Sequence, residues 1–398
     1  MEIQTTTTVN LLRKLVSYAN LGGESNLAIA QWIQEYLDAL KITHYEVPNA
    51  EGNKKGIHCR IGPPVDGGII LSGHMDVVPV EGQNWDTAPF ELTDKGDGKL
   101  YGRGACDMKG FLALCLQALP SMLAADLRIP IYLAFSYDEE TGCEGAPPLI
   151  NHIQKTYSEK PRFAIIGEPT MMQPVIGQKG IFVLRTIVKG SAGHSSRIRQ
   201  EVSAVHEAAR AIIWLENKMD DLIREGRTDE RFDPPHTSIH VGTIKGGIAT
   251  NVIADHAEFS WDVRVIPDDS AMDILEDFRI YCRKREEELK SNDQNFSIRT
   301  EIVHQPVPAL NTSKNSEILK IIQQLTGNHH WSAVSYATEA GQYAEAGFEA
   351  IVCGPGSIEQ AHRANEYIST DQLEKGEEMI RALIRFCSQD KEVGNQKN

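Results

Sequence analysis

Hydrophobic residues along the chain recur with two periods, and the alternation between them predicts a series of strands and helices. Up to about residue 178, short apolar runs typical of buried strands alternate with stretches in which apolar residues recur every three to four positions, as on one face of a helix. Val9–Val16 and Asn26–Leu40 predict amphipathic helices. Met108–Ala124 predicts a long, almost wholly apolar helix packed on a sheet, and we expect Pro120 to kink or shorten its last turn.

Five apolar runs in this part and near the carboxyl end predict buried strands. In an open α/β sheet, residues that follow such strands gather at one edge, so residues far apart in sequence can share a site. The runs are Gly68–Ser72, Lys99–Gly102, Ile129–Tyr137, Phe163–Gly167 and Glu349–Cys353.

The pattern changes near Gly180, where a βαββαβ order begins. Such a segment forms a small sheet with two helices on one face and buries its own core. We therefore predict an α/β fold: a split domain, residues 1–179 and 306–398, with a mixed sheet flanked by helices, and an inserted α+β domain, residues 180–305. The inserted elements are predicted at Ile181–Lys189, Val202–Lys218, Ser238–Lys245, Ala257–Ile266, Ala271–Leu289 and Phe296–Val303.

The composition of the chain disfavours some classes of binding partner. The 398 residues carry a formal charge of −15, which disfavours nucleic acid and anionic membranes as partners. No apolar run approaches the roughly 20 residues of a membrane span. Residues 1–10 lack the features of a signal peptide, and residues 388–398 are polar and expected to fray. Seven scattered cysteines favour reduced thiols in a cytoplasmic enzyme.

Six polar residues follow the predicted strands and form the candidate site. Two imidazoles and four carboxylates at one sheet edge would concentrate negative charge, and a divalent cation is the natural neutraliser. This ligand set suits zinc or a zinc-like ion. The residues are His74, Asp107, Glu139, Glu140, Glu168 and His362.

Each residue also has an ordinary structural interpretation. His74 and Asp76 are two apart on one strand face, where the carboxylate can accept from the imidazole of a ligand or of a core histidine. Asp107 follows a glycine-rich stretch and precedes a helix, so capping is the alternative. The adjacent Glu139 and Glu140 need either solvent or a cation; with a cation, one can ligate while the other accepts a proton from water. Glu168 and His362 are otherwise a turn acid and a surface histidine.

Six motifs then make the sequence recognisable. The chain resembles the M20-type co-catalytic metallopeptidase and deacylase family and, within it, the acetylornithine deacetylases. The motifs cover most of the chain. They are SGHMDVVPV (72–80), LYGRGACDMKGF (100–111), DEETGCEGA (138–146), AIIGEPT (164–170), GSAGHSSR (190–197) and CGPGSIEQAHRANEYI (353–368).

The resemblance implies a role for each candidate. It implies two divalent ions, zinc or cobalt, with Asp107 bridging them in a catalytic domain. Glu139 would be the general base, and Asp76 would orient His74. One ion would be held by His74, Asp107 and Glu168, and the other by Asp107, Glu140 and His362.

The resemblance also implies a homodimer formed by the inserted domain. His194 would reach the active site of the other subunit and stabilise the oxyanion, whereas its alternative is a locally bonded turn histidine. Asn251, Arg264 and Gly354 would contact a small-molecule substrate, although Arg264 also suits a surface ion pair. Glu339 is the candidate for recognising a cationic side chain.

The activity implied is hydrolysis of an N-acyl amino acid. The expected substrate is N2-acetyl-L-ornithine, which would give L-ornithine and acetate in arginine biosynthesis. The alternatives are a succinyl-diaminopimelate desuccinylase, an aminoacylase or a dipeptidase, and a non-catalytic homologue that only binds.

Overall fold

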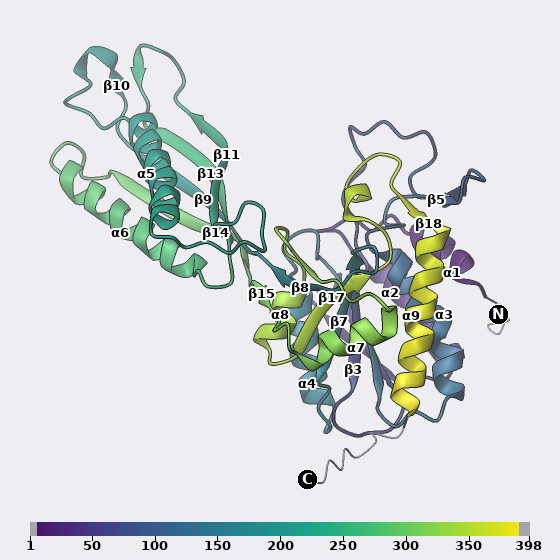
Figure 1. Cartoon of the computed structure of the whole chain (residues 1–398). Helices are drawn as coiled ribbons and strands as arrows, with labels where there is room; N and C mark the ends of the chain where they lie inside the picture. The colour runs from purple at the N-terminus through teal and green to yellow at the C-terminus, as the bar shows by residue number, and fades with distance from the viewer. Residues whose placement is uncertain (1–5, 390–398) are drawn as a thin grey trace, which may run out of the picture. The chain divides into compact units, whose positions relative to one another are not determined.

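The computed structural model describes residues 6–389, and the chain forms two compact units (Figure 1). Unit 1 comprises Met1–Ile176, Thr312–Ser332 and Thr338–Asn398, and unit 2 comprises Gly177–Asn311 and Ala333–Ala337. Of the tail that we expect to fray, residues 390–398 lie outside the described residues, as do residues 1–5 of the amino-terminal segment.

The main mixed sheet has nine strands, and its strands β1, β2, β6, β3, β7 and β17 belong to unit 1. Its strand order is β1-β2-β6-β3-β7-β17-β8-β15, with β16 paired to β8, and β6, β3, β7 and β17 are mutually parallel. The strands are β1 (His44–Pro48), β2 (Lys55–Ile61), β3 (Ile69–His74), β6 (Ile131–Ser136), β7 (Phe163–Pro169), β8 (Val175–Gln178), β15 (Leu310–Asn311), β16 (Ser332–Val334) and β17 (Glu349–Gly354).

Helices cover both faces of this sheet (Figure 1). One face packs on α1, α2, α3, α7 and α9 through the main hydrophobic core, and α4 and α8 lie against β6 and β17. Coverage on both sides explains why β3, β6 and β7 are wholly buried and apolar rather than alternating. The helices are α1 (Thr8–Val16), α2 (Leu27–Ala39), α3 (Lys109–Ala124), α4 (Ala146–Thr156), α7 (Glu317–Thr326), α8 (Ala340–Glu345) and α9 (Thr370–Ser388).

The predicted mixed α/β fold with a large sheet flanked by helices is confirmed. Pro120 does not shorten α3, which continues to Ala124. Proline removes one backbone donor, but the residues after it can keep helical dihedral angles.

The strand before Asp107 is the main error of the prediction. The run at residues 99–102 forms β5 (Lys99–Tyr101), which pairs with β4 (Thr93–Asp94) and β18 (Tyr367–Ser369) in a separate three-stranded antiparallel sheet. Asp107 therefore does not follow a strand of the main sheet. It lies two residues before the start of α3.

Unit 2 contains a four-stranded antiparallel sheet, in the order β11-β13-β9-β14, and packs α5 and α6 against it. Its separate core includes Phe182, Trp261 and Phe278. A two-stranded sheet of β10 and β12 completes the unit. The elements are β9 (Gly180–Lys189), β10 (Gly193–His194), α5 (Ala204–Arg224), β11 (Ser238–Gly246), β12 (Val252–Ile253), β13 (His256–Val265), α6 (Ala271–Leu289) and β14 (Ser297–Val307).

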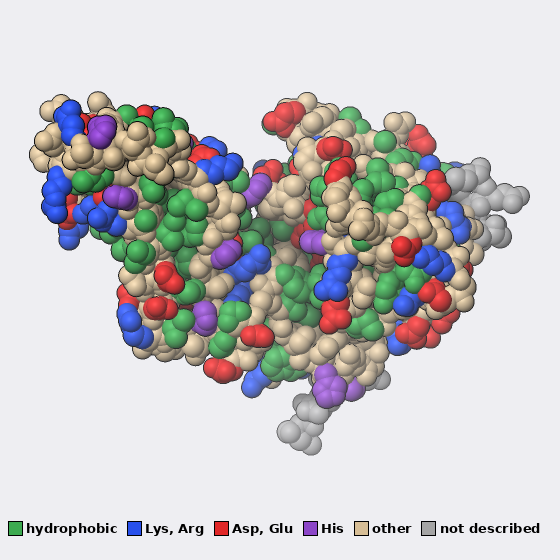
Figure 2. Space-filling view, turned by 90° about the horizontal axis from the view of Figure 1, so that it is seen from above, with side chains coloured by type: hydrophobic (Ala, Val, Ile, Leu, Met, Phe, Trp, Pro, Cys, Tyr) green, Lys and Arg blue, Asp and Glu red, His purple; other side chains and the backbone are tan. Residues whose placement is uncertain are grey.

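The surface carries both signs of charge. On the face that Figure 2 shows, basic and acidic side chains are interspersed in each unit. Among the described residues, no helix has the length and apolar character that a membrane span requires.

Candidate metal centre

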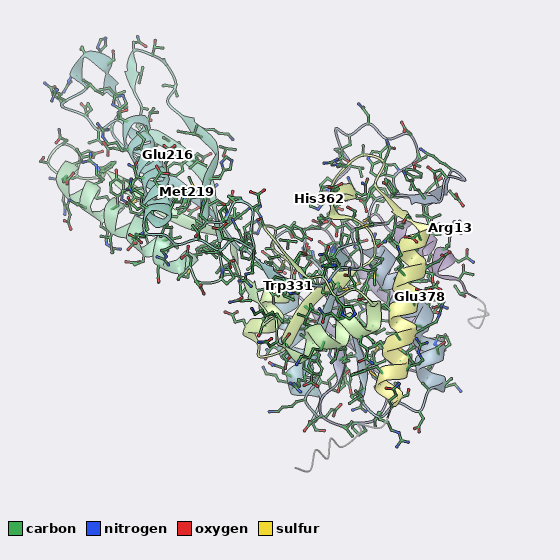
Figure 3. The ribbon with its side chains drawn as sticks, viewed as in Figure 1. Arg13, Glu216, Met219, Trp331, His362 and Glu378 are labelled. Atoms are coloured by element: carbon green, nitrogen blue, oxygen red, sulfur yellow. The ribbon has the colours of Figure 1, made fainter. Side chains whose placement is uncertain are left out.

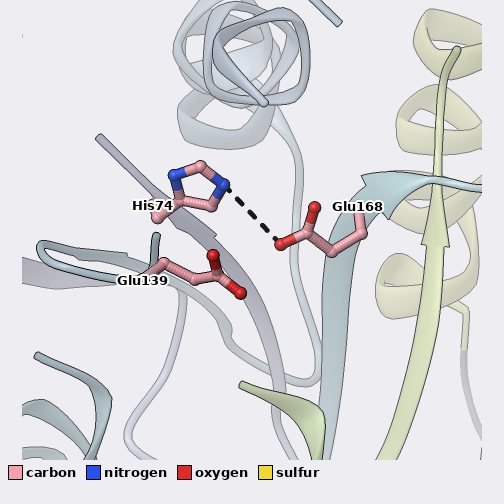
Figure 4. A group of neighbouring side chains, drawn as sticks. All are labelled: His74, Glu139 and Glu168. Carbon is pink, nitrogen blue, oxygen red and sulfur yellow. Dashed lines mark ion pairs between the residues drawn. The ribbon is translucent and has the colours of Figure 1, made fainter. Parts of the chain in front are cut away.

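The candidate ligands of unit 1 meet at the carboxyl edge of its parallel strands. His74 is the last residue of β3 and pairs in register with the last residue of β6. Glu139 and Glu140 follow β6, and Glu168 is the penultimate residue of the neighbouring β7. Figure 4 shows the side chains of His74, Glu139 and Glu168 converging from these three strand ends. Strand order thus places groups from distant parts of the sequence together.

His74 is buried with its two nitrogens in different surroundings. Nδ1 lies 2.9 Å from the backbone carbonyl oxygen of Asp76, and Nε2 lies 3.1 Å from Asp107 Oδ1 and 3.7 Å from Glu168 Oε1. Nδ1–H donating to that carbonyl leaves the Nε2 lone pair facing the carboxylates, which is the tautomer a metal ligand needs. Burial opposes protonation, but the surrounding carboxylates, Asp107 first, raise the pKa of His74 well above its ordinary value.

Asp107 lies between the two histidines. Its Oδ1 faces His74, whereas its Oδ2 lies 3.4 Å from His362 Nε2. The same His362 nitrogen lies 3.0 Å from Glu140 Oε2. His362 belongs to the loop between β17 and β18 (Figure 3), and its side chain is half exposed. A carboxylate that offers one oxygen to each side could be shared by two ions.

The cluster holds more negative charge than its surroundings stabilise. Burial raises the pKa of Glu139, Glu140 and Glu168, and the charge of Asp107 raises each further. For Asp107 itself burial acts in the same direction, but hydrogen bonds from His362 and His74 hold its pKa below the ordinary value. Perturbed pKa values among buried carboxyl groups that face one another are typical of functional sites.

The donor set fits divalent cations. The groups His74, Glu139, Glu168 and His74, Asp107, Glu140 each offer ligand atoms that lie within 4.8 Å of one another. Glu168 Oε1 is buried and has no hydrogen-bond partner among residues 6–389. Imidazole nitrogens and carboxylate oxygens are the ligands of catalytic zinc.

Asp76 differs from its expected placement. It follows β3 rather than lying on its face, because the strand ends at His74. Its carboxylate lies 3.6 Å from His74 Nδ1, farther than its own carbonyl, and instead accepts the backbone N–H groups of Glu139 and Glu140, both at 3.2 Å. Asp76 therefore holds the turn that carries the two glutamates as well as the ring of His74.

Sequence reasoning missed the role of Asp138 in the same turn. Asp138 has a φ of 56° and accepts from the backbone N–H of Gly23 at 2.8 Å and from the buried Lys54 ammonium. These contacts pin the residue that precedes Glu139. The only local signal was an acidic triplet, which is equally typical of a solvated loop.

Glu339 directly precedes α8 in unit 1 and contacts β3. Its Oε2 accepts from Ser72 Oγ at 3.4 Å, and its buried Oε1 has no hydrogen-bond partner among the described residues. Burial raises the pKa of Glu339 to about 7. The carboxylate of Glu339 thus lies next to Ser72, which is two residues before His74 on β3.

His194 and Asn251 lie together in unit 2. β10 pairs with β12 so that His194 is opposite Val252, and the backbone N–H of Ser195 donates to Asn251 O at 3.1 Å. The exposed His194 ring places Nδ1 2.9 Å from Ser196 Oγ, which is the local bond of a turn histidine.

Arg264 lies near the other end of the unit 2 sheet. It pairs in register with Ile181 at the start of β9, whereas β10 comes after the end of β9. Arg264 lies eight positions along β13 from His256, which pairs with Lys189 at the end of β9, a span of about 26 Å. Arg264 Nε lies 3.5 Å from Asp262 Oδ1, so the surface ion pair left open by the sequence is present.

Gly354 ends β17 and packs directly on β7. A Cβ at this position would lie 2.1 Å from the carbonyl oxygen of Gly167, and Gly354 N–H donates to Thr170 Oγ1 at 3.2 Å. Close backbone packing is therefore enough to require glycine here.

Comparison with known sequences identifies the family. The sequence model of Peptidase family M20/M25/M40 matches residues 70–385. The chain belongs to this family. The resemblance seen in the motifs is thus confirmed.

Two curated relatives of this M20-family chain are named acetylornithine deacetylase. The protein from Myxococcus xanthus is 36% identical over 323 residues, covering 80% of each chain, and that from Proteus mirabilis (strain HI4320) is 32% identical over 400 residues, covering 98% of this chain and all of its own.

Solved structures show the same fold. An M20-family metallo-carboxypeptidase from Sulfolobus solfataricus has a TM-score of 0.73 at 17% identity and covers 96% of this chain and 100% of its own. A tripeptidase from Staphylococcus aureus has a TM-score of 0.72 at 19% identity, with 96% and 98% covered. A Bacillus subtilis protein described as a dinuclear metal-binding peptidase of the M20 family has a TM-score of 0.60 at 16% identity, with 96% and 98% covered. Family and curated relatives together make this chain a metal-dependent amidohydrolase.

Proposed function

We propose that this M20-family enzyme hydrolyses the acetyl amide of N2-acetyl-L-ornithine to L-ornithine and acetate, as a cytoplasmic step of arginine biosynthesis. The observation that carries the proposal is the convergence of two imidazoles and four carboxylates on one strand edge, in a chain 32–36% identical to named acetylornithine deacetylases.

Two divalent ions, zinc or cobalt, fit the cluster. His74, Asp107 and Glu168 would hold one ion, and Asp107, Glu140 and His362 would hold the other. When bound, the ions supply Lewis acidity that polarises the acyl carbonyl and lowers the pKa of the attacking water. Asp76 orients two of these ligands. Its backbone carbonyl contacts the ring of His74, and its carboxylate accepts the backbone N–H of Glu140.

Glu139 is the proposed general base. Its carboxylate belongs to the same group as His74 and Glu168 but is needed by neither proposed ligand set, so it is free to take a proton from the attacking water. Once protonated, the same carboxyl group would return that proton to the departing α-amine. One residue can thus serve as base and then as acid.

His194 is the proposed oxyanion donor and is supplied by the second subunit of a homodimer. Support comes from its exposed ring on the β10–β12 ribbon, where Nδ1 accepts the backbone N–H of Ser196 at 3.2 Å. With Nδ1 engaged, Nε2 is the nitrogen that can donate to a developing negative charge.

Four residues are proposed to contact substrate. Arg264 would bind the α-carboxylate, Asn251 and Gly354 would line the pocket, and Glu339 would accept the cationic side chain of ornithine. The open Oε1 of the buried Glu339 supports the last assignment, because an ammonium group would satisfy it by a charge-assisted hydrogen bond.

A substrate panel tests this function. The chelated protein is reloaded with zinc or cobalt, and kcat/KM is measured for N2-acetyl-L-ornithine, N-succinyl-diaminopimelate, a neutral N-acetyl amino acid and a dipeptide. We expect acetylornithine to exceed the others by about tenfold or more. A higher value for another substrate would reassign the specificity, and no turnover of any would support a non-catalytic homologue.

A further inference from the structure

A buried ion pair that the proposed reaction does not use contacts the backbone of Asp107 in unit 1. Arg103 and Glu366 are each 1% exposed, and Arg103 Nη1 donates to Glu366 Oε2 at 2.7 Å. Two opposite charges are costly to bring out of water, and a buried ion pair is often no more stabilising than an apolar replacement. The pair is therefore better explained by the neighbouring groups that it holds in place than by a contribution to stability.

Glu366 holds the backbone at the bridging carboxylate. Its Oε1 accepts the N–H groups of Cys106 at 2.9 Å and Asp107 at 3.1 Å. One carboxylate oxygen thus fixes two consecutive peptide groups just before α3, while its other oxygen is held by Arg103. The position of the Asp107 side chain depends on that backbone.

Arg103 extends the same network to the loop of His362. Its Nη2 donates to Gln83 Oε1 at 2.6 Å, and Gln83 Nε2 donates to the carbonyl oxygen of His362 at 2.8 Å. Arg103 Nη1 also lies 3.3 Å from the carbonyl oxygen of Arg363. The guanidinium stacks on Trp85, 5.2 Å from the ring centre. Its planar fork can make these contacts together, which a lysine ammonium cannot.

We propose that Glu366, Arg103 and Gln83 are positioning residues that fix Asp107 and His362 relative to each other and so set the affinity of the metal centre. None of the three is a candidate ligand or base. Glu366 acts on the shared carboxylate and therefore on both ions, whereas Gln83 acts on the loop of His362 and therefore on one. The inference rests on the proposed two-ion function.

The test measures binding of Co²⁺ alone to the chelated full chain by calorimetry and visible absorption. For Glu366→Gln we expect both Co²⁺ affinities to fall by about 10–100-fold, the usual effect of removing a partner that orients ligands. For Gln83→Leu we expect a similar fall for one ion and no change for the other. A merely structural role would not produce that split.

Glu159→Gln is the matched control. Glu159 is also buried and pairs with Arg60, but it precedes β7 and so lies at the amino edge of the sheet, away from the ligands. It should lower the thermal midpoint without changing Co²⁺ affinity. An equal loss of affinity in this control would overturn the proposal, as would wild-type affinity in the Glu366 and Gln83 variants.

Two further outcomes have definite meanings. If Glu366→Gln does not fold, Gln83→Leu decides alone, because Gln83 is only half buried. If the wild-type chain binds fewer than two Co²⁺ ions, the proposed two-ion function fails, and with it the split expected for Gln83→Leu. Loss of affinity for the remaining ion in Glu366→Gln, against unchanged affinity in Glu159→Gln, then supports the positioning role of Glu366, and unchanged affinity in both overturns it.

Discussion

His362 Nε2 lies 3.0 Å from Glu140 Oε2, which joins the loop after β17 to the turn after β6. The contact brings together two segments that are more than two hundred residues apart in the sequence. It also gives the second proposed ion its only imidazole.

Replacing His362 with alanine should remove one ion. Loss of one of three ligands leaves Asp107 and Glu140 without an imidazole partner, so we expect metal content to fall from about two to about one ion per chain. Metal analysis after dialysis measures this. His330→Ala, an exposed histidine of unit 1, should keep both ions, and retention of two ions by His362→Ala would contradict the assignment.

Replacing Glu139 with glutamine should abolish proton transfer and spare metal binding. We expect kcat to fall by about 10²–10⁴-fold, since the amide cannot accept the proton of water. Steady-state kinetics together with metal analysis separate the two effects. Glu144→Gln, an exposed glutamate of the same turn, should turn over normally. Turnover close to wild type in Glu139→Gln would remove its role as base.

Replacing Glu339 with glutamine should lower selectivity for a cationic side chain. We expect kcat/KM for acetylornithine to fall by about tenfold or more, with little change for N-acetyl-norvaline, which lacks the ammonium group. The exposed Glu345, the last residue of the helix that begins directly after Glu339, provides the control Glu345→Gln. An equal loss for both substrates would show that Glu339 supports the site without recognising charge.

Mixing two inactive variants tests whether His194 acts across subunits. His194→Ala keeps Glu139, and Glu139→Gln keeps His194, so a hybrid dimer contains one complete site. Random exchange of subunits should restore about one quarter of wild-type activity. The assay follows activity after the variants are mixed under exchange conditions and after each is incubated alone. Absence of recovery, with exchange shown by mass spectrometry, would place His194 in the site of its own subunit or outside catalysis.

Stability at acid pH should depend on His58. Its Nε2 lies 2.7 Å from His152 Nδ1 and its Nδ1 lies 3.0 Å from Tyr157 OH, and burial, followed by the charge of His152, lowers its pKa from 6.5 to about 3. The unfolded imidazole binds a proton more readily than the folded one. This residue's contribution is therefore complete above pH 6.5 and is lost as pH falls toward 3.

The size of that loss follows from the pKa difference. Each pH unit below 6.5 removes up to about 1.4 kcal/mol of unfolding free energy, or about 2 kcal/mol between pH 8 and pH 5. Urea unfolding of the wild type and of His58→Gln at both pH values measures it. The variant should lose about 2 kcal/mol less than the wild type. Equal losses would show that His58 does not titrate in this way.

Elements with a strong local pattern could be predicted from the sequence. The helix predicted at Ala271–Leu289 has the same bounds in the structure, because Ser270 caps its first turn and one apolar face packs on the unit 2 sheet. The parallel strands β3, β6 and β7 were also found, since burial on both faces leaves continuous apolar runs.

Features that depend on long-range partners could not be predicted. β5 is only three residues long and pairs with β18 from the far end of the chain, so nothing local distinguished it from a strand of the main sheet. Glu366 is similar, because its contacts with Asp107 and Arg103 exist only after folding. The same holds for the hydrogen bonds from the Glu139–Glu140 turn to Asp76.

Anomalous diffraction from crystals of the zinc-loaded protein would test the central claim most directly. Two peaks should lie about 3.5–4 Å apart, with Asp107 between them. His74 and Glu168 should contact one ion, and Glu140 and His362 the other. A single peak, or ions held by residues outside this cluster, would contradict the account.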